Sequence, residues 1–275
     1  MLYSQIMEWI DAVILGLVQG ITEFLPVSSS GHLVLVRDWL SISDADGLAF
    51  DAMLHFATTA AVIIYFWSDI WTLIQVALRK LGKLPVNERD ITLLYAVLIG
   101  TIPAALLGFF LEDVVTEYLQ KPLIVSGVLF CTSIFFMYAE WRYYLRPAHN
   151  ELTLSSGIKI GLFQAMALIP GMSRSGSTIA GGMLLGLSRY ESARFSFLLA
   201  IPITLGVGLK KGLDLLGDEG SVDWFLILIG VSISFVTALL VIHFFLSFIR
   251  KYTLWPFVWY GIILASMVWY VTLFT

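Results

Sequence analysis

The sequence predicts an all-α polytopic membrane protein, with six transmembrane helices and two re-entrant helical hairpins in an inverted-topology repeat. The first observation is composition: 59% of the 275 residues are hydrophobic, 13% are charged and the mean hydropathy is +0.87. Soluble domains carry about 25% charged residues. The second is a polar segment that occurs twice within this apolar sequence. We expect one integral membrane domain over 1–275, with repeats over about 1–145 and about 146–275.

Charge and the cysteine content exclude several other classes of protein. A net charge of −4 argues against a nucleic-acid partner, which would need a basic face. The single cysteine, Cys131, cannot form an internal disulfide. The N-terminus has no basic region, and Glu8 and Asp11 precede its apolar run, so we expect no signal peptide.

Six segments are apolar enough and long enough to cross a bilayer, which takes about 20 residues of helix. They are 49–67, 91–111, 123–139, 192–209, 224–249 and 254–274. Two pairs of apolar pieces are only about half that length. The pairs are 12–25 with 33–40, and 158–169 with 179–187. Pro26 separates the first pair and Pro170 the second, so each pair predicts a re-entrant hairpin, with its irregular backbone surrounded by protein or water.

The polar segments at the two breaks align at a constant offset of 145 residues. The first reads QGITEFLPVSSSGH over 19–32, and the second reads QAMALIPGMSRSGST over 164–178. The aligned identities include Gly16 with Gly161, Gln19 with Gln164, Ser28 with Ser173, Ser30 with Ser175 and Gly31 with Gly176. Ser29 aligns with Arg174. Three predicted spans separate the copies, and an odd number of crossings inverts the second copy, a plan typical of secondary transporters.

Lysine and arginine in short loops predict the orientation. These basic residues are concentrated in the segments 68–90, 140–159 and 250–253, whereas acidic residues predominate in the loops 112–122 and 210–223. The three basic segments are therefore expected in the cytoplasm and both termini outside. The first hairpin would then enter from the outer face and the second from the inner face, so that their tips meet near the midplane.

Glu23 is the first candidate for chemistry. A carboxylate at membrane depth is a functional candidate by default, although a structural glutamate paired with a backbone donor is the alternative. Gln19 lies four residues earlier and shares one helix face with it. His32 lies in an otherwise apolar setting, where we favour proton transfer over a buried structural role. Four other polar residues in or beside spans are expected to be structural or to lie at helix ends: Asp51, His55, Glu140 and His243. Of these four, Asp51 and His55 are the best remaining candidates for a functional role.

The serine-rich breaks predict an anion site. Serines at 28–30 precede an apolar run, so one of them can cap the helix that follows. Two helix starts aimed at one point, each with backbone N–H groups and hydroxyls, favour a bound anion. Arg174 adds a planar fork suited to phosphate oxygens, and Thr178 lies four residues further along the same helix face.

At these residues the sequence resembles the bacitracin-resistance family of undecaprenyl-diphosphate phosphatases. The resemblance is carried by QGITEFLPVSSSGH and PGMSRSGSTIAGG, and extends over essentially the whole chain, including FSFLLAIP after the second motif. One position departs from a common pattern: Gln19 stands where the family often has Glu. This leaves Glu23 as the only carboxylate of the pair and weakens a metal scheme that needs two.

The resemblance implies removal of one phosphate from the C55 isoprenoid diphosphate carrier, in the bacterial inner membrane, at a site opening toward the periplasm. It makes Ser29 the nucleophile through a transient phosphoserine, with Glu23 or His32 taking its proton. His32 as nucleophile is the rival assignment. Arg174 would stabilise the phosphoryl charge. The remaining substrate-binding residues would be Gln19, Ser28, Ser30, Gly31, Ser173, Ser175 and Thr178. A divalent cation, Mg²⁺ or else Ca²⁺, would bridge the diphosphate, with Glu23 as its candidate ligand.

The runner-up function is a polyprenyl-phosphate flippase or transporter, because inverted repeats with broken helices are a transporter plan. The dense set of Ser, His, Glu and Arg side chains at the breaks favours an enzyme. An ion channel is a weaker third reading, since no span carries a repeated charged or carbonyl-lined filter. The expected partners are the isoprenoid diphosphate substrate, membrane lipid and a second copy of the chain in a homodimer.

Overall fold

The computed structural model describes residues 2–40, 42, 47–119, 121–217 and 223–274, and within them every regular element is a helix. The helices are α1 (Leu2–Thr22), α2 (Ser29–Leu40), α3 (Gly47–Tyr65), α4 (Trp67–Leu81), α5 (Glu88–Tyr118), α6 (Pro122–Leu145), α7 (Leu154–Met166), α8 (Arg174–Leu184), α9 (Arg189–Gly217), α10 (Trp224–Ile249) and α11 (Trp255–Phe274). The all-α prediction is confirmed.

Five helices of the described part are long and apolar enough to cross a membrane: α5, α6, α9, α10 and α11. A sixth crossing requires α3 and α4 to be counted as one broken span, because the two helices meet at a bend of 78°. The chain is therefore a multi-pass membrane protein. Several spans are longer than predicted, since a helix continues past its apolar core into polar residues; α5, for example, extends to Tyr118.

The prediction of a loop over 68–90 is wrong. Residues Trp67–Leu81 form α4, and only 82–87 connect it to α5. Large apolar side chains recur along α4 at helical spacing and remain exposed, among them Trp71, Ile74 and Leu78. Such an amphipathic pattern forms a helix without a continuous apolar run, so a search for spans by apolar length does not find it. Residues 218–222 of the predicted 210–223 loop lie outside the described residues.

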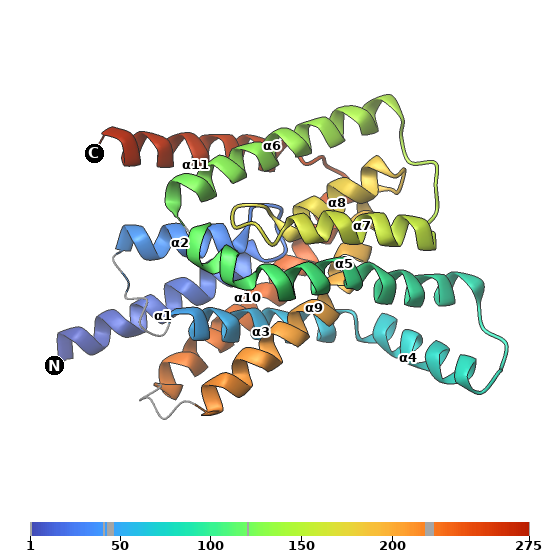
Figure 1. Ribbon diagram of the computed structural model, residues 1–275, viewed down its shortest axis with the longest axis horizontal. Coiled ribbons are helices and arrows are strands. Elements are labelled where there is room, and N and C mark those ends of the chain that lie inside the picture. Colours follow the sequence, from blue (N-terminus) through green and yellow to red (C-terminus); the bar gives the residue numbers. More distant parts are fainter. Residues whose placement is uncertain (1, 41, 43–46, 120, 218–222, 275) are drawn as a thin grey trace.

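The half-length pieces form two helical pairs. α1 and α2 are joined by 23–28, and α7 and α8 by 167–173. The first pair enters the molecule from one end and the second from the opposite end (Figure 1). α1 is longer than the predicted piece 12–25, because it begins at Leu2; its apolar part, Trp9–Thr22, is still shorter than a span. α1 begins and α11 ends at the same end of the molecule, whereas the turns 82–87 and 146–153 lie at the other (Figure 1).

Equivalent glycines pack the two pairs against equivalent partners. A Cβ on Gly16 of α1 would lie 2.7 Å from the carbonyl oxygen of Gly230 in α10. A Cβ on Gly161 of α7 would lie 2.2 Å from the carbonyl oxygen of Gly100 in α5. Small residues at such crossings allow two helix backbones to touch. Because Gly16 and Gly161 are also aligned in sequence, the repeat is visible in the packing of each pair against a span of the other half.

Candidate functional site

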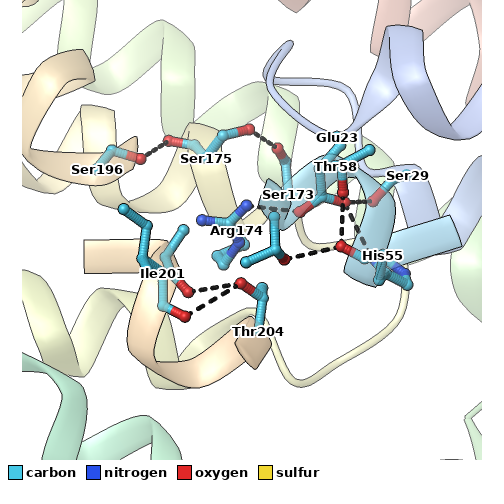
Figure 2. Close-up of polar contacts among 12 residues, drawn as sticks. Glu23, Ser29, His55, Thr58, Ser173, Arg174, Ser175, Ser196, Ile201 and Thr204 are labelled. Carbon is cyan, nitrogen blue, oxygen red and sulfur yellow. Dashed lines mark hydrogen bonds and ion pairs between the residues drawn. The ribbon is translucent and has the colours of Figure 1, made fainter. Parts of the chain in front are cut away.

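The two loops between paired helices meet in the interior. Arg174, the first residue of α8, donates from Nη2 to Glu23 Oε1 at 2.6 Å. Ser175 donates to the carbonyl oxygen of Leu25 at 3.0 Å. Figure 2 shows Arg174 reaching toward Glu23, with Ser29 on the far side of the carboxylate. The expectation that the two polar segments meet is confirmed, because Ser29 and Arg174 both donate to the carboxylate of Glu23.

The aligned serines Ser28 and Ser173 begin the second helix of each pair. Ser28 Oγ accepts from the N–H of Gly31 at 3.3 Å, and Ser173 Oγ accepts from the N–H of Gly176 at 3.1 Å. A serine oxygen in this position satisfies one of the free N–H groups at a helix start. The predicted capping role of a serine in each copy is therefore confirmed, and it falls on the two residues that the repeat aligns.

Glu23 is the centre of the polar cluster. The residue is 6% exposed. Its Oε2 accepts from Ser29 Oγ at 2.7 Å and from Gln19 Nε2 at 2.9 Å, and lies 3.1 Å from Nδ1 of His55. Its Oε1 accepts from Arg174. A buried carboxylate is tolerated when it is paired and hydrogen-bonded, and Glu23 has both kinds of partner.

Ser29 has the surroundings of an activated nucleophile. It is partly exposed at the first residue of α2, and its hydroxyl proton points to the carboxylate of Glu23. A hydroxyl within hydrogen-bond reach of a base that is itself held by other groups is the arrangement that nucleophilic catalysis requires. In this geometry Glu23, and not His32, is the group that accepts from Ser29; its role as a base stays a prediction.

His32 lies apart from that contact. Its Nδ1 is 2.8 Å from the carbonyl oxygen of Ser28, and its Nε2 is 2.6 Å from the hydroxyl of Tyr260. A carbonyl oxygen only accepts, so Nδ1 carries a proton and Nε2 accepts from Tyr260. Both ring nitrogens are thus engaged away from Ser29 and Glu23. The two roles considered for His32, base or nucleophile, stay predictions. Tyr260, on α11, carried no sequence signal that pairs it with His32.

Several hydroxyls predicted to bind substrate make hydrogen bonds within the protein. The hydroxyl oxygens of Ser173 and Ser175 are 3.2 Å apart, and Ser175 also donates to the carbonyl oxygen of Leu25 in the first loop. Thr178 is buried, donates to the carbonyl oxygen of Arg174 at 2.8 Å and lies 2.6 Å from the hydroxyl of Ser196 on α9. These contacts fix the backbone around Arg174. Ser30 is partly exposed, and the substrate-binding roles assigned to these residues stay predictions.

Arg174 retains a free donor. Among the described residues its Nη1 is buried without a hydrogen-bond partner. Leaving a buried donor unpaired costs about 1–3 kcal/mol, more for a charged group. A phosphate oxygen would supply the missing acceptor and make use of the planar guanidinium fork. The loop therefore has a built-in preference for an anionic ligand beside Glu23.

The cluster does not fit a cation held by the protein alone. Within the described residues no group of three or more His, Cys, Asp or Glu side chains could hold a metal ion. Both oxygens of Glu23 already accept hydrogen bonds, one of them from the guanidinium of Arg174. Mg²⁺ is usually bound by one or two carboxylates together with substrate phosphates. Any cation here would depend mainly on oxygens of the substrate.

His55 is part of the polar cluster around Glu23, and it lies in the middle of α3 rather than at a helix end; its expected structural role stays a prediction. It lies on α3, and its Nδ1 contacts both Gln19 and Glu23. The other secondary candidates are structural or peripheral. Asp51 pairs with Arg37 at 2.6 Å. Glu140 pairs with Arg189 and accepts the N–H of Leu254, and His243 lies beside Tyr65.

The sequence of this chain is similar to those of known proteins. The model of the family described as "Bacitracin resistance protein BacA" matches residues 12–267. A protein from Alteromonas mediterranea named undecaprenyl-diphosphatase is 42% identical over 96% of this chain and 99% of its own. Proteins of the same name from Idiomarina loihiensis and Rubrobacter xylanophilus are each 40% identical, over 94% and 95% of this chain and 97% of each relative.

Proposed function

Because the chain belongs to the bacitracin resistance protein BacA family, we propose that it hydrolyses undecaprenyl diphosphate to undecaprenyl phosphate and inorganic phosphate. This activity would recycle the lipid carrier for cell-wall synthesis and give resistance to bacitracin. The observation that carries the proposal is the Ser29 hydroxyl donating to a buried Glu23 that also pairs with Arg174. The proposed nucleophile Ser29, the proposed base Glu23 and the phosphate-binding guanidinium of Arg174 are thus in direct contact.

In the proposed reaction Ser29 Oγ attacks the terminal phosphorus as its proton passes to Glu23 Oε2. The bond from that phosphorus to the bridging oxygen breaks, and undecaprenyl phosphate leaves. Water then attacks the phosphorus of the phosphoserine, the bond from phosphorus to Ser29 Oγ breaks, inorganic phosphate leaves with both protons of the water, and the proton held by Glu23 returns to Ser29 Oγ. Each step keeps the phosphoryl group next to Arg174.

Arg174 would stabilise the charge that develops on the phosphoryl oxygens. Its Nη1 has no hydrogen-bond partner within the described part of the chain. When Glu23 takes the serine proton, the carboxyl becomes neutral and its attraction for Nη2 weakens. The whole guanidinium is then available to the phosphate at the moment when charge moves there.

The proposed setting is the bacterial inner membrane, crossed six times, with the α1–α2 and α7–α8 pairs as re-entrant hairpins and the site opening to the periplasm. Support comes from the spans and from the opposite entry of the two pairs. The segments 68–90 and 140–159, which carry the basic residues, also lie at the end of the molecule opposite the start of α1 and the end of α11 (Figure 1). A cysteine at position 83 is expected to resist an impermeant reagent on intact cells, and one at 275 to react, in a background without Cys131. The reverse labelling would contradict this orientation.

The test of the activity uses detergent-purified protein and a short isoprenoid diphosphate, with inorganic phosphate as the readout. Phosphate release by the native sequence, absent in Ser29→Ala, is expected. A flippase alone would release none, because a micelle has no sides to cross.

Chelation followed by addition of Mg²⁺ or Ca²⁺ tests the proposed cation requirement in the same assay. Sedimentation in detergent tests the predicted homodimer.

A further inference from the structure

His55 reaches the carboxylate of Glu23 from outside both polar loops. Its Nδ1 lies 2.8 Å from Gln19 Nε2 and 3.1 Å from Glu23 Oε2. Gln19 and Glu23 come from α1 and its connection, whereas His55 comes from the middle of α3. Figure 2 shows His55 beside Glu23 and Ser29. His55 touches the oxygen that accepts from Ser29, and not the oxygen that pairs with Arg174.

The pairing of Glu23 with Arg174 is incomplete in an informative way. Arginine and a carboxylate favour a bidentate fork, with two parallel N–H···O bonds. Here Nη2 and Oε1 are joined, while Nη1 is buried and has no partner among the residues that the structure describes. The second carboxylate oxygen, which would complete a fork, is held by Gln19, Ser29 and His55.

Either hydrogen-bond arrangement of the imidazole holds that oxygen. If Nδ1 carries a proton, it donates to Glu23 Oε2 directly. If Nδ1 is unprotonated, it accepts one N–H of the Gln19 amide while the other N–H donates to Glu23. In both cases a ring nitrogen at the Nδ1 position keeps Oε2 turned toward Ser29.

We propose that His55 is a positioning residue that keeps Glu23 out of a bidentate fork with Arg174. The inference rests on the proposed function. By holding Oε2, His55 and Gln19 keep one carboxylate oxygen facing the Ser29 hydroxyl and leave Arg174 Nη1 free for a phosphate oxygen. Without this contact the carboxylate turns to satisfy Nη1, and both the base and the phosphate donor are lost together.

Three substitutions of His55 test whether the nitrogen at Nδ1 matters. Asparagine places its amide close to the position of Nδ1, glutamine places its amide nearer that of Nε2, and leucine fills similar space with no polar atom. We expect His55→Leu and His55→Gln to lower kcat about 10- to 100-fold, the usual cost of a misplaced catalytic group. His55→Asn should stay within about threefold of the native sequence. A packing role would favour leucine instead.

A double-mutant cycle with Arg174→Lys supplies a second readout. Lysine cannot form the fork, so His55→Leu should cost much less in that background than in the native one. His149→Leu is the matched control, because His149 is exposed and, within the described contacts, its side chain hydrogen-bonds only the carbonyl oxygen of Pro147. It is expected to leave kcat unchanged.

Equal activity of the asparagine and leucine variants, or effects of His55→Leu and Arg174→Lys that simply multiply, would overturn the inference. If His55→Leu does not fold, the comparison of asparagine with glutamine still decides, because both are polar and differ mainly in where the amide lies. Absence of phosphate release by the native sequence would instead contradict the proposed function, so the two failures are distinguishable.

Discussion

The two polar loops share one framework and divide the chemistry. Ser28 and Ser173 start equivalent helices through equivalent bonds to Gly31 and Gly176. The residue after each serine differs: Ser29 in the first loop and Arg174 in the second, and both bind Glu23. The repeat provides two helix starts that meet, and the difference at one aligned position places a hydroxyl and a guanidinium on the same carboxylate.

The loops also differ in backbone strain. Ser28 has φ +70°, whereas Ser173 has φ −63°. A left-handed conformation costs a non-glycine residue of order 1–3 kcal/mol, and such residues gather at functional sites. The strained loop is the one that carries Ser29 and Glu23. Among the two capping serines the strained backbone is therefore at Ser28, beside Ser29, and not at Ser173, beside Arg174, although the two caps are alike.

The largest expected effect comes from the position where the loops diverge. Ser29→Ala should lower the rate of phosphate release at least about 10³-fold, because the attacking oxygen is gone. Substrate should still bind, because Arg174 remains. Turnover and binding of an isoprenoid diphosphate can be measured on the same preparation. Near-normal turnover in Ser29→Ala, with none in His32→Ala, would make the histidine the nucleophile.

Arg174→Lys tests the other half of that position. A point charge keeps the attraction for Glu23 but cannot offer a second nitrogen to phosphate. We expect kcat to fall about 10²- to 10³-fold, similar to the loss of an oxyanion donor elsewhere. Retention of most of the activity in steady-state phosphate release would show that the charge alone suffices.

Ser175→Ala removes the hydroxyl that joins the second loop to the carbonyl oxygen of Leu25 in the first. The unmet buried acceptor should cost about 1–3 kcal/mol. We expect slow but measurable turnover and a lower free energy of unfolding, followed in denaturant with the detergent held constant. Complete loss of activity in a fully stable protein would assign Ser175 a direct role in the reaction.

The smallest effect concerns the caps themselves. At position 173, alanine and glycine should differ by less than about 1 kcal/mol in their cost to unfolding free energy, since either loses the cap. At position 28 glycine should be favoured over alanine by an additional increment of order 1 kcal/mol, because only glycine adopts φ +70° freely. Identical alanine–glycine differences at the two positions would remove the distinction in strain.

The sequence by itself determined the helical class, the places where the two half-length helical pairs are broken and the pairing of the two breaks. Apolar length predicts spans because a bilayer requires it, and the 145-residue offset aligned Ser28 with Ser173 and Gly16 with Gly161 before any packing was known. Serine at a helix start is a local preference, so capping followed from neighbouring residues alone. Glu23, Ser29 and Arg174 were found by the same polar interruption of apolar sequence.

Only the tertiary structure decided which helices face these loops. His55 lies 36 residues from Gln19, and Tyr260 lies 228 residues from His32. A single polar residue in a span looks the same in sequence whether it faces a site, a neighbouring helix or lipid. Its role depends on which helix packs beside it and with what rotation, and that is set by contacts between segments far apart in the chain, such as Gly161 against Gly100.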